Sequence, residues 1–177
     1  MVHTIVFPPS GSMLDVACGP GNLLLKIHKK HPALQLTGLD IDPAILHIAS
    51  KKTRGLSNIK LVESSATKLP FKDNQFAIVT SSLAFHHLDS EQKQEAFKEI
   101  FRVLKPGGNF WLFDFAKPET ILGKFLAKIY RHIEETDDGI KNRLPSMYKN
   151  AGFQNIKTYW SSYGMISLLS GQKPVNY

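Results

Sequence analysis

Short apolar runs alternate along the chain with stretches in which apolar residues recur at helical spacing. This alternation is typical of a parallel sheet whose faces are covered by helices. The last two predicted strands are closely spaced, so we expect them to pair antiparallel. No repeat or linker divides residues 1–177, which predicts a single α/β domain. The predicted strands are 12–17, 34–39, 59–63, 76–81, 109–113, 154–160 and 164–170, and the predicted helices are 23–30, 44–52, 90–104, 120–135 and 145–150.

Polar residues and prolines mark the helix boundaries. Asp42 and Pro43 supply an N-cap and a first-turn proline for the second helix. Ser90 is the expected N-cap of the third helix. The run Lys105–Gly108, which contains a proline and two glycines, is expected to end that helix.

A glycine-rich turn follows the first predicted strand. Gly19 and Gly21 lie between this strand and the first helix, where glycine lets the backbone approach a ligand and present amides to an anion. Asp40 ends the second strand about 20 residues later, where a carboxylate can accept hydrogen bonds from ribose hydroxyls. Together these features predict a site for an adenosine-containing ligand.

The position of a third glycine separates two classes of such ligands. In the dinucleotide fingerprint G-x-G-x-x-G, the third glycine allows close packing while the helix receives a pyrophosphate. Leu24 occupies that position here. A bulky residue is compatible with a ligand that has no pyrophosphate, such as S-adenosylmethionine, whose methionine carboxylate is a smaller anion.

Five runs of the chain form an ordered series. They are LDVACGPGN (14–22), TGLDIDPAIL (37–46), ATKLPFKDNQFAIV (66–79), FHHL (85–88) and RVLKPGGNFWL (102–112). Their order and spacing resemble the successive motifs of the class I S-adenosylmethionine-dependent methyltransferases, and most closely the small-molecule enzymes related to ubiquinone and menaquinone biosynthesis. The resemblance implies transfer of the methyl group of S-adenosylmethionine to a small-molecule acceptor.

The resemblance also implies a fold and a set of site residues. The fold is a Rossmann-like, doubly wound, mostly parallel sheet of seven strands in the order 3-2-1-4-5-7-6, with the last strand antiparallel. The cofactor is S-adenosylmethionine. The implied cofactor-binding residues are Asp15, Ala17, Gly19, Gly21, Ser81 and Leu83 near the methionine part, Asp40 at the ribose, and Ile41, Ser65 and Ala66 at the adenine.

Two departures from the family pattern change what we expect of adenine binding and of the cover over the site. Ser65 stands where the family often has an aspartate that receives the adenine amino group, and a hydrogen bond to a neutral hydroxyl is weaker than one to a carboxylate. Only about ten residues precede the first strand, where family members usually have helices that cover the site and exclude water. We therefore expect no N-terminal lid helices in this chain. Three alternatives stay open: the chain is a fragment of a longer protein, a partner or a second copy supplies the lid, or the site is unusually open.

Three polar residues at the predicted rim are candidates for catalysis. His86 and His87 follow the fourth strand, and Asp114 ends the fifth. A histidine there could take a proton from the acceptor. Methyl transfer from a sulfonium can also proceed by alignment and desolvation alone, which would leave these residues with contact roles only.

Charge and local sequence indicate which class of molecule accepts the methyl group. The net charge is +7, but the basic residues are scattered along predicted helix faces. The run Ser81–Ala84 lacks the Asn/Asp-Pro-Pro-Tyr pattern of nucleic-acid amino-methyltransferases, and the lone Cys18 lies in the wrong place for a cytosine nucleophile. Nucleic acid is therefore disfavoured as a substrate. A small, partly apolar acceptor is favoured, bounded by Phe85, Trp111, Phe115 and the segment from Lys117 to Pro145.

Other features are expected to be absent. The histidines show no metal-ligand spacing, so we expect no metal. Apolar runs are too short for a membrane span, and no secretory signal is evident, which predicts a cytoplasmic protein. Two alternatives to an active methyltransferase stay open: a non-catalytic cofactor-binding or partner-binding subunit, and an NAD-dependent oxidoreductase.

Overall fold

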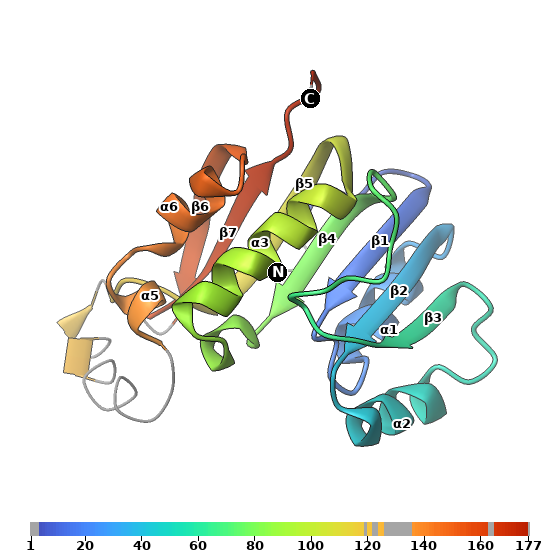
Figure 1. Ribbon diagram of the computed structural model, residues 1–177. Coiled ribbons are helices and arrows are strands. Elements are labelled where there is room, and N and C mark those ends of the chain that lie inside the picture. Colours follow the sequence, from blue (N-terminus) through green and yellow to red (C-terminus); the bar gives the residue numbers. More distant parts are fainter. Residues whose placement is uncertain (1–3, 119, 122–123, 126–135, 163–164, 177) are drawn as a thin grey trace.

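The strands form one sheet in the order β3-β2-β1-β4-β5-β7-β6 in the computed structural model, which describes residues 4–118, 120–121, 124–125, 136–162 and 165–176. All pairs among β1 to β5 are parallel, and β7 is antiparallel to both β5 and β6. The predicted strand order and orientation are therefore confirmed (Figure 1). The strands are β1 (Gly11–Val16), β2 (Leu34–Asp40), β3 (Ile59–Glu63), β4 (Phe76–Ser82), β5 (Leu104–Phe115), β6 (Gln154–Ser162) and β7 (Ile166–Gln172).

Helices cover both faces of the sheet because side chains alternate along each buried strand. Met13 of β1 belongs to the apolar cluster that contains Leu24 and Ile27 of α1 (Asn22–Lys30) and one residue of α2 (Pro43–Lys52). Leu14, the next residue of β1, belongs to the cluster on the other face, beneath α3 (Ser90–Val103) and α6 (Leu144–Asn150). Figure 1 shows α3 and α6 together on that face.

The helix boundaries show where the sequence prediction was right and where it was wrong. Asp42 caps α2 by accepting a hydrogen bond from the Ala44 amide, as expected. Ser90 does not cap α3: Asp89 does, through a reciprocal capping box with Gln92. Both residues are good cap formers, and the glutamine three positions after Asp89 favours Asp89.

The segment after β5 is only partly described. Most of the predicted helix 120–135 lies outside the described residues. A short helix, α5 (Asp137–Ile140), precedes α6, and a 3-10 turn, η1 (Phe85–His87), follows β4. Among the described helices, none has both the length and the apolar character required to cross a membrane.

Candidate cofactor and acceptor site

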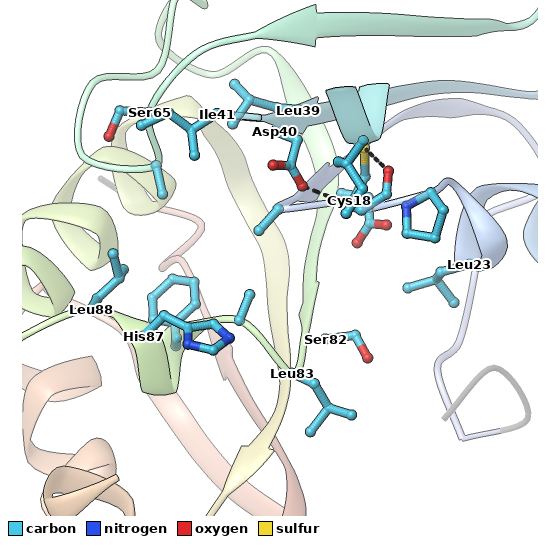
Figure 2. Close-up of a pocket in the computed structure, with 18 of the residues that line it drawn as sticks. Cys18, Leu23, Leu39, Asp40, Ile41, Ser65, Ser82, Leu83, His87 and Leu88 are labelled. Carbon is cyan, nitrogen blue, oxygen red and sulfur yellow. Dashed lines mark hydrogen bonds between the residues drawn. The ribbon is translucent and has the colours of Figure 1, made fainter. Parts of the chain in front are cut away.

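A cavity of about 490 Å³ opens at the edge of the sheet where β1, β2 and β4 end. Parallel strands place their carboxyl ends at the same edge, so the polar residues that follow these strands converge there. The lining consists of Asp15, Ala17, Cys18, Gly19, Pro20, Asn22, Leu23, Leu39, Asp40, Ile41, Ile45, Ser64, Ser65, Ala66, Ser82, Leu83, Ala84, Phe85, His87 and Leu88. Figure 2 shows Asp40, Ile41 and Ser65 on one side of the cavity, and Leu83 and His87 on the facing side.

Asp40 connects the glycine turn to the end of β2. Its Oδ2 accepts a hydrogen bond of 2.8 Å from the Gly19 amide, and its Oδ1 accepts one of 3.1 Å from the Asp42 amide. A carboxylate oxygen can accept more than one hydrogen bond, and Asp40 is only partly buried. Both oxygens therefore keep acceptor capacity for a ligand in the cavity.

The glycine turn depends on backbone conformations that favour glycine. Gly19 has φ 52° and Gly21 has φ 76°, and Gly21 is the N-cap of α1. Asn22 and Leu23, the first residues of α1, line the cavity, whereas Gly21 is not among the lining residues. The amides at the start of α1 thus lie beside the cavity, as expected for a site that receives an anionic group.

Gly38 supplies the close packing that the missing third glycine would give. A Cβ at Gly38 would lie 2.6 Å from Leu24 Cδ1 and 2.8 Å from Cys18 Sγ. Leu24 is fully buried. The small residue therefore lies on β2 instead of α1, and the bulky residue of α1 packs into the space that it leaves.

Asp15 lies at the base of the cavity with only 2% of its surface exposed. Its Oδ1 accepts a 2.6 Å hydrogen bond from the Thr80 hydroxyl. Burial raises the pKa of Asp15 to about 7; the Thr80 hydrogen bond opposes this shift, and the charge of Asp40 adds to it. Burial and the same two carboxylates raise the pKa of Cys18 to about 12, so its thiol is uncharged and unreactive, consistent with a packing role.

Ser65 and Ala66 line the side of the cavity that follows β3. The Ser65 hydroxyl accepts a 3.2 Å hydrogen bond from the Thr67 amide and lies 2.9 Å from the Thr67 hydroxyl. Ser65 thus forms a local turn with Thr67. Part of its hydrogen-bonding capacity is already used by the protein.

The end of β4 places its two serines differently. Ser81 is fully buried and is not among the cavity residues, and its Oγ has no hydrogen-bond partner in the described part of the chain. Ser82 points the other way and lines the cavity, because successive strand residues face opposite sides. Leu83 follows with φ 52° and is 44% exposed at the cavity edge. A leucine in this left-handed region is strained, a feature common at functional sites.

The three catalytic candidates also occupy different positions. His87 is exposed and lines the cavity, whereas His86 and Asp114 are buried and do not. His86 Nδ1 lies 2.7 Å from Asp114 Oδ1. The two histidine rings are 4.1 Å apart between centroids. Only His87 is in contact with the cavity, and His86 links it to Asp114.

Asp114 is held by backbone groups on two sides. Its Oδ2 accepts hydrogen bonds from the Ala84 and Phe85 amides at 3.1 and 2.8 Å, and its Oδ1 accepts one from the Phe115 amide at 2.7 Å. Because Ala84 and Phe85 belong to the segment after β4, this carboxylate fixes that segment to the end of β5.

Several cavity residues were not singled out by the sequence analysis, among them Asn22, Leu23, Ile45, Ser64, Ser82 and Leu88. Asn22 and Leu23 adjoin the glycine turn, and Ser82 follows Ser81, so proximity to predicted residues was an available signal. Among the described histidine, cysteine and acidic side chains, no group of three is placed to hold a metal ion.

Comparison with known proteins identifies the family. Residues 13–108, more than half of the chain, match the family model described as a methyltransferase domain. A demethylmenaquinone methyltransferase of Staphylococcus aureus is 30% identical over 182 aligned positions, which cover 90% of this chain and 75% of the relative.

Solved structures show the same fold. A Nostoc punctiforme protein of the O-methyltransferase type, whose activity is inferred only, superposes with a TM-score of 0.82 at 20% identity, covering 97% of this chain and 55% of the other. A phosphoethanolamine N-methyltransferase of Haemonchus contortus, solved with S-adenosylmethionine, superposes with a TM-score of 0.76 at 16% identity. The superposition covers 96% of this chain and 50% of the other. The family match, the Staphylococcus relative and the sheet order agree: this chain belongs to the class I S-adenosylmethionine-dependent methyltransferases.

Proposed function

We propose that the cavity binds S-adenosylmethionine with its ribose at Asp40, and that the methyl group is transferred to a small molecule held on the side of Leu83 and His87. The observation that carries this proposal is the geometry of Asp40. Its two oxygens are oriented by the Gly19 and Asp42 amides and still face the cavity. A carboxylate oriented in this way can accept both hydroxyls of a ribose.

The other cofactor contacts follow from the lining of the cavity. Ile41, 69% exposed beside Asp40, offers an apolar surface for the adenine, and Ser65 and Ala66 lie on the same side. Asp15, Ala17 and Gly19 are proposed to surround the methionine part, where the amides of the turn suit its carboxylate. An exposed Ile41 is consistent with this role, since a stacked adenine would cover it.

The transfer step needs few protein groups. A nucleophilic oxygen, nitrogen or carbon of the acceptor forms a bond to the methyl carbon, the carbon–sulfur bond breaks, and its electron pair stays on sulfur. The product S-adenosylhomocysteine is neutral at sulfur, and the acceptor loses a proton. His87 is the side chain placed to take that proton or to contact the acceptor.

His86 and Asp114 are proposed as positioning residues. An ionised carboxylate only accepts hydrogen bonds, so His86 Nδ1 is the donor in the 2.7 Å contact. His86 is thereby fixed against Asp114, and its ring lies against that of His87. This arrangement restricts His87 to the rim of the cavity.

The proposal is tested by turnover. Incubation with S-adenosylmethionine and fractionated cell extract should release S-adenosylhomocysteine when an acceptor is present. His87→Ala should lower this rate by about 100-fold or more if His87 is a general base. The control is His47→Ala, which changes an exposed histidine of α2 outside the cavity. Full activity of His87→Ala across the pH range would remove His87 from the mechanism.

A second candidate function is a cofactor-binding or partner-binding subunit without turnover. It is favoured by Ser65, whose hydroxyl is already bonded to Thr67 and offers less to the adenine than an aspartate. Release of S-adenosylhomocysteine with any acceptor would exclude it. The cytoplasmic location, and a lid supplied by a partner or a second copy, stay predictions.

A further inference from the structure

A second cavity, of about 200 Å³, lies at the opposite half of the sheet edge. It is bounded by the segment after β5, by α5 and the start of α6, and by β6 and β7. Its described lining residues are Ala116, Lys117, Gly139, Asn142, Leu144, Pro145, Thr158, Ser167 and Leu169. None of them lines the cofactor cavity. The polar pocket, as we call this group, is therefore a separate site.

The size of the polar pocket restricts what it can hold. One water molecule needs roughly 10–15 Å³ of such space, far less than is present. Drug-sized ligands occupy cavities of roughly 300–1,000 Å³, which is more than is present. The volume of about 200 Å³ thus suits a small metabolite or an inorganic anion.

Ser167 marks the pocket as incomplete without a ligand. The residue is 2% exposed, and its Oγ has no hydrogen-bond partner among the residues that the structure describes. A buried hydroxyl left unpaired costs about 1–3 kcal/mol, so such groups are rare in folded proteins. A hydroxyl rotates freely enough to donate to an acceptor placed in the pocket.

The remaining polar groups indicate the charge of that ligand. Lys117 is the one charged residue among the described lining residues. Its ammonium only donates hydrogen bonds, and the Asn142 amide and the Thr158 hydroxyl supply further donors. The nearby Asp138 does not line the pocket and is neutralised by Lys93 and Arg143. Donors with a net positive charge favour an oxyanion.

We propose that the polar pocket binds a small oxyanion, a carboxylate or a phosphate, through Lys117 and the Ser167 hydroxyl. The pocket shares no described lining residue with the cofactor cavity, and its test measures anion binding alone, without cofactor or turnover. Its success or failure therefore leaves the proposed function untouched.

The test is a nuclear magnetic resonance titration of the full chain with two probes, inorganic phosphate and malonate. At least one probe should give saturable shifts at the amides of Lys117, Gly139 and Ser167. Ser167→Ala and Lys117→Gln should each weaken this binding by at least about tenfold. Lys124→Gln, which removes an exposed charge that does not line the pocket, should leave this binding unchanged.

Two controls separate specific binding from loss of structure or from general attraction to charge. Ser167→Ala removes a hydroxyl without a partner, so the variant should be no less stable than the wild type when no probe is present. Stronger response to phosphate than to malonate would identify a phosphate site, and the reverse a carboxylate site. Absence of saturable shifts with both probes, or equal binding by wild type and Ser167→Ala, would overturn the proposal.

Discussion

Asp40 and Asp114 stand at the ends of two parallel strands, β2 and β5, yet the two regions use the same side chain differently. Asp40 is partly exposed and receives one backbone amide on each oxygen. Asp114 is 2% exposed and receives three backbone amides and His86. The first carboxylate can still accept hydrogen bonds from a ligand, and the second is fully engaged within the protein.

The difference shows that a strand-end carboxylate is a candidate ligand group only while its acceptor capacity remains free. The β2 end presents to the cavity a carboxylate with spare acceptor capacity, Asp40, and an exposed apolar side chain, Ile41. The β5 end, with Asp114 and His86, is a rigid support for the segment that carries Leu83 and His87. The proposed function thus assigns binding and positioning to two halves of one sheet edge.

Removal of the Asp114 carboxylate should have the largest effect on stability. Asp114→Ala leaves the buried Phe85 amide, two partly buried amides and the buried His86 ring without their acceptor, and each buried donor left unpaired costs about 1–3 kcal/mol. The free energy of unfolding from chemical denaturation measures the loss. Asp73→Ala, which removes an exposed ion pair with Arg102, should cost about 1 kcal/mol or less. Equal losses in the two variants would contradict the supporting role of Asp114.

Asp15 should make stability depend on pH. Its pKa is about 7 when folded and near the ordinary value of 3.8 when unfolded. Between these values the folded state holds a proton that the unfolded state has lost, so this contribution to stability is full below pH 3.8 and is lost as the pH rises through about 7.

Asp15→Asn removes that dependence. At pH 8 its free energy of unfolding should exceed that of the wild type by about 2–4 kcal/mol, and at pH 4 the two values should differ little. Chemical denaturation of both proteins across this range measures the change. A difference that stays constant with pH would show that Asp15 titrates normally.

Substitution of Ser65 should have a smaller effect, on the affinity for the cofactor. Ser65→Asp supplies a carboxylate that can accept from both the Thr67 amide and an adenine amino group, and a charge-assisted hydrogen bond is about twice as strong as a neutral one. Affinity for S-adenosylmethionine should rise by about fivefold in calorimetry. Ser65→Asn, which is of similar shape without the charge, should gain less. Loss of affinity in Ser65→Asp would place the adenine elsewhere.

The resemblance of five sequence runs to a methyltransferase family implied the sheet order. The glycine turn after β1 and the carboxylate at the end of β2, by contrast, are marked by local signals. The strand-to-helix turns set the positions of Gly19, Gly21 and Asp40. Because these residues follow neighbouring parallel strands, they come together at the same edge of the sheet. Asp89 could also have been recognised as the cap of α3, since Gln92 completes the capping box with it.

The distinct roles of His86 and His87 could not be predicted in this way. The two residues are identical and adjacent, and the 3-10 turn η1 directs one ring inward and the other to the cavity. The partner of His86, Asp114, lies 28 residues away in the chain. Gly38 is similar: its packing against Leu24 depends on the distance between β2 and α1, which the sequence does not encode locally.

The binding of S-adenosylmethionine to Asp40→Ala, measured by calorimetry, tests the central claim most directly. Asp42→Ala is the matched control, because it removes the cap of α2 at a cost of about 1 kcal/mol in stability and keeps the backbone amide that Asp40 accepts. The account predicts binding at least about tenfold weaker in Asp40→Ala and unchanged in Asp42→Ala. Wild-type affinity in Asp40→Ala would contradict the assignment of this cavity to the cofactor.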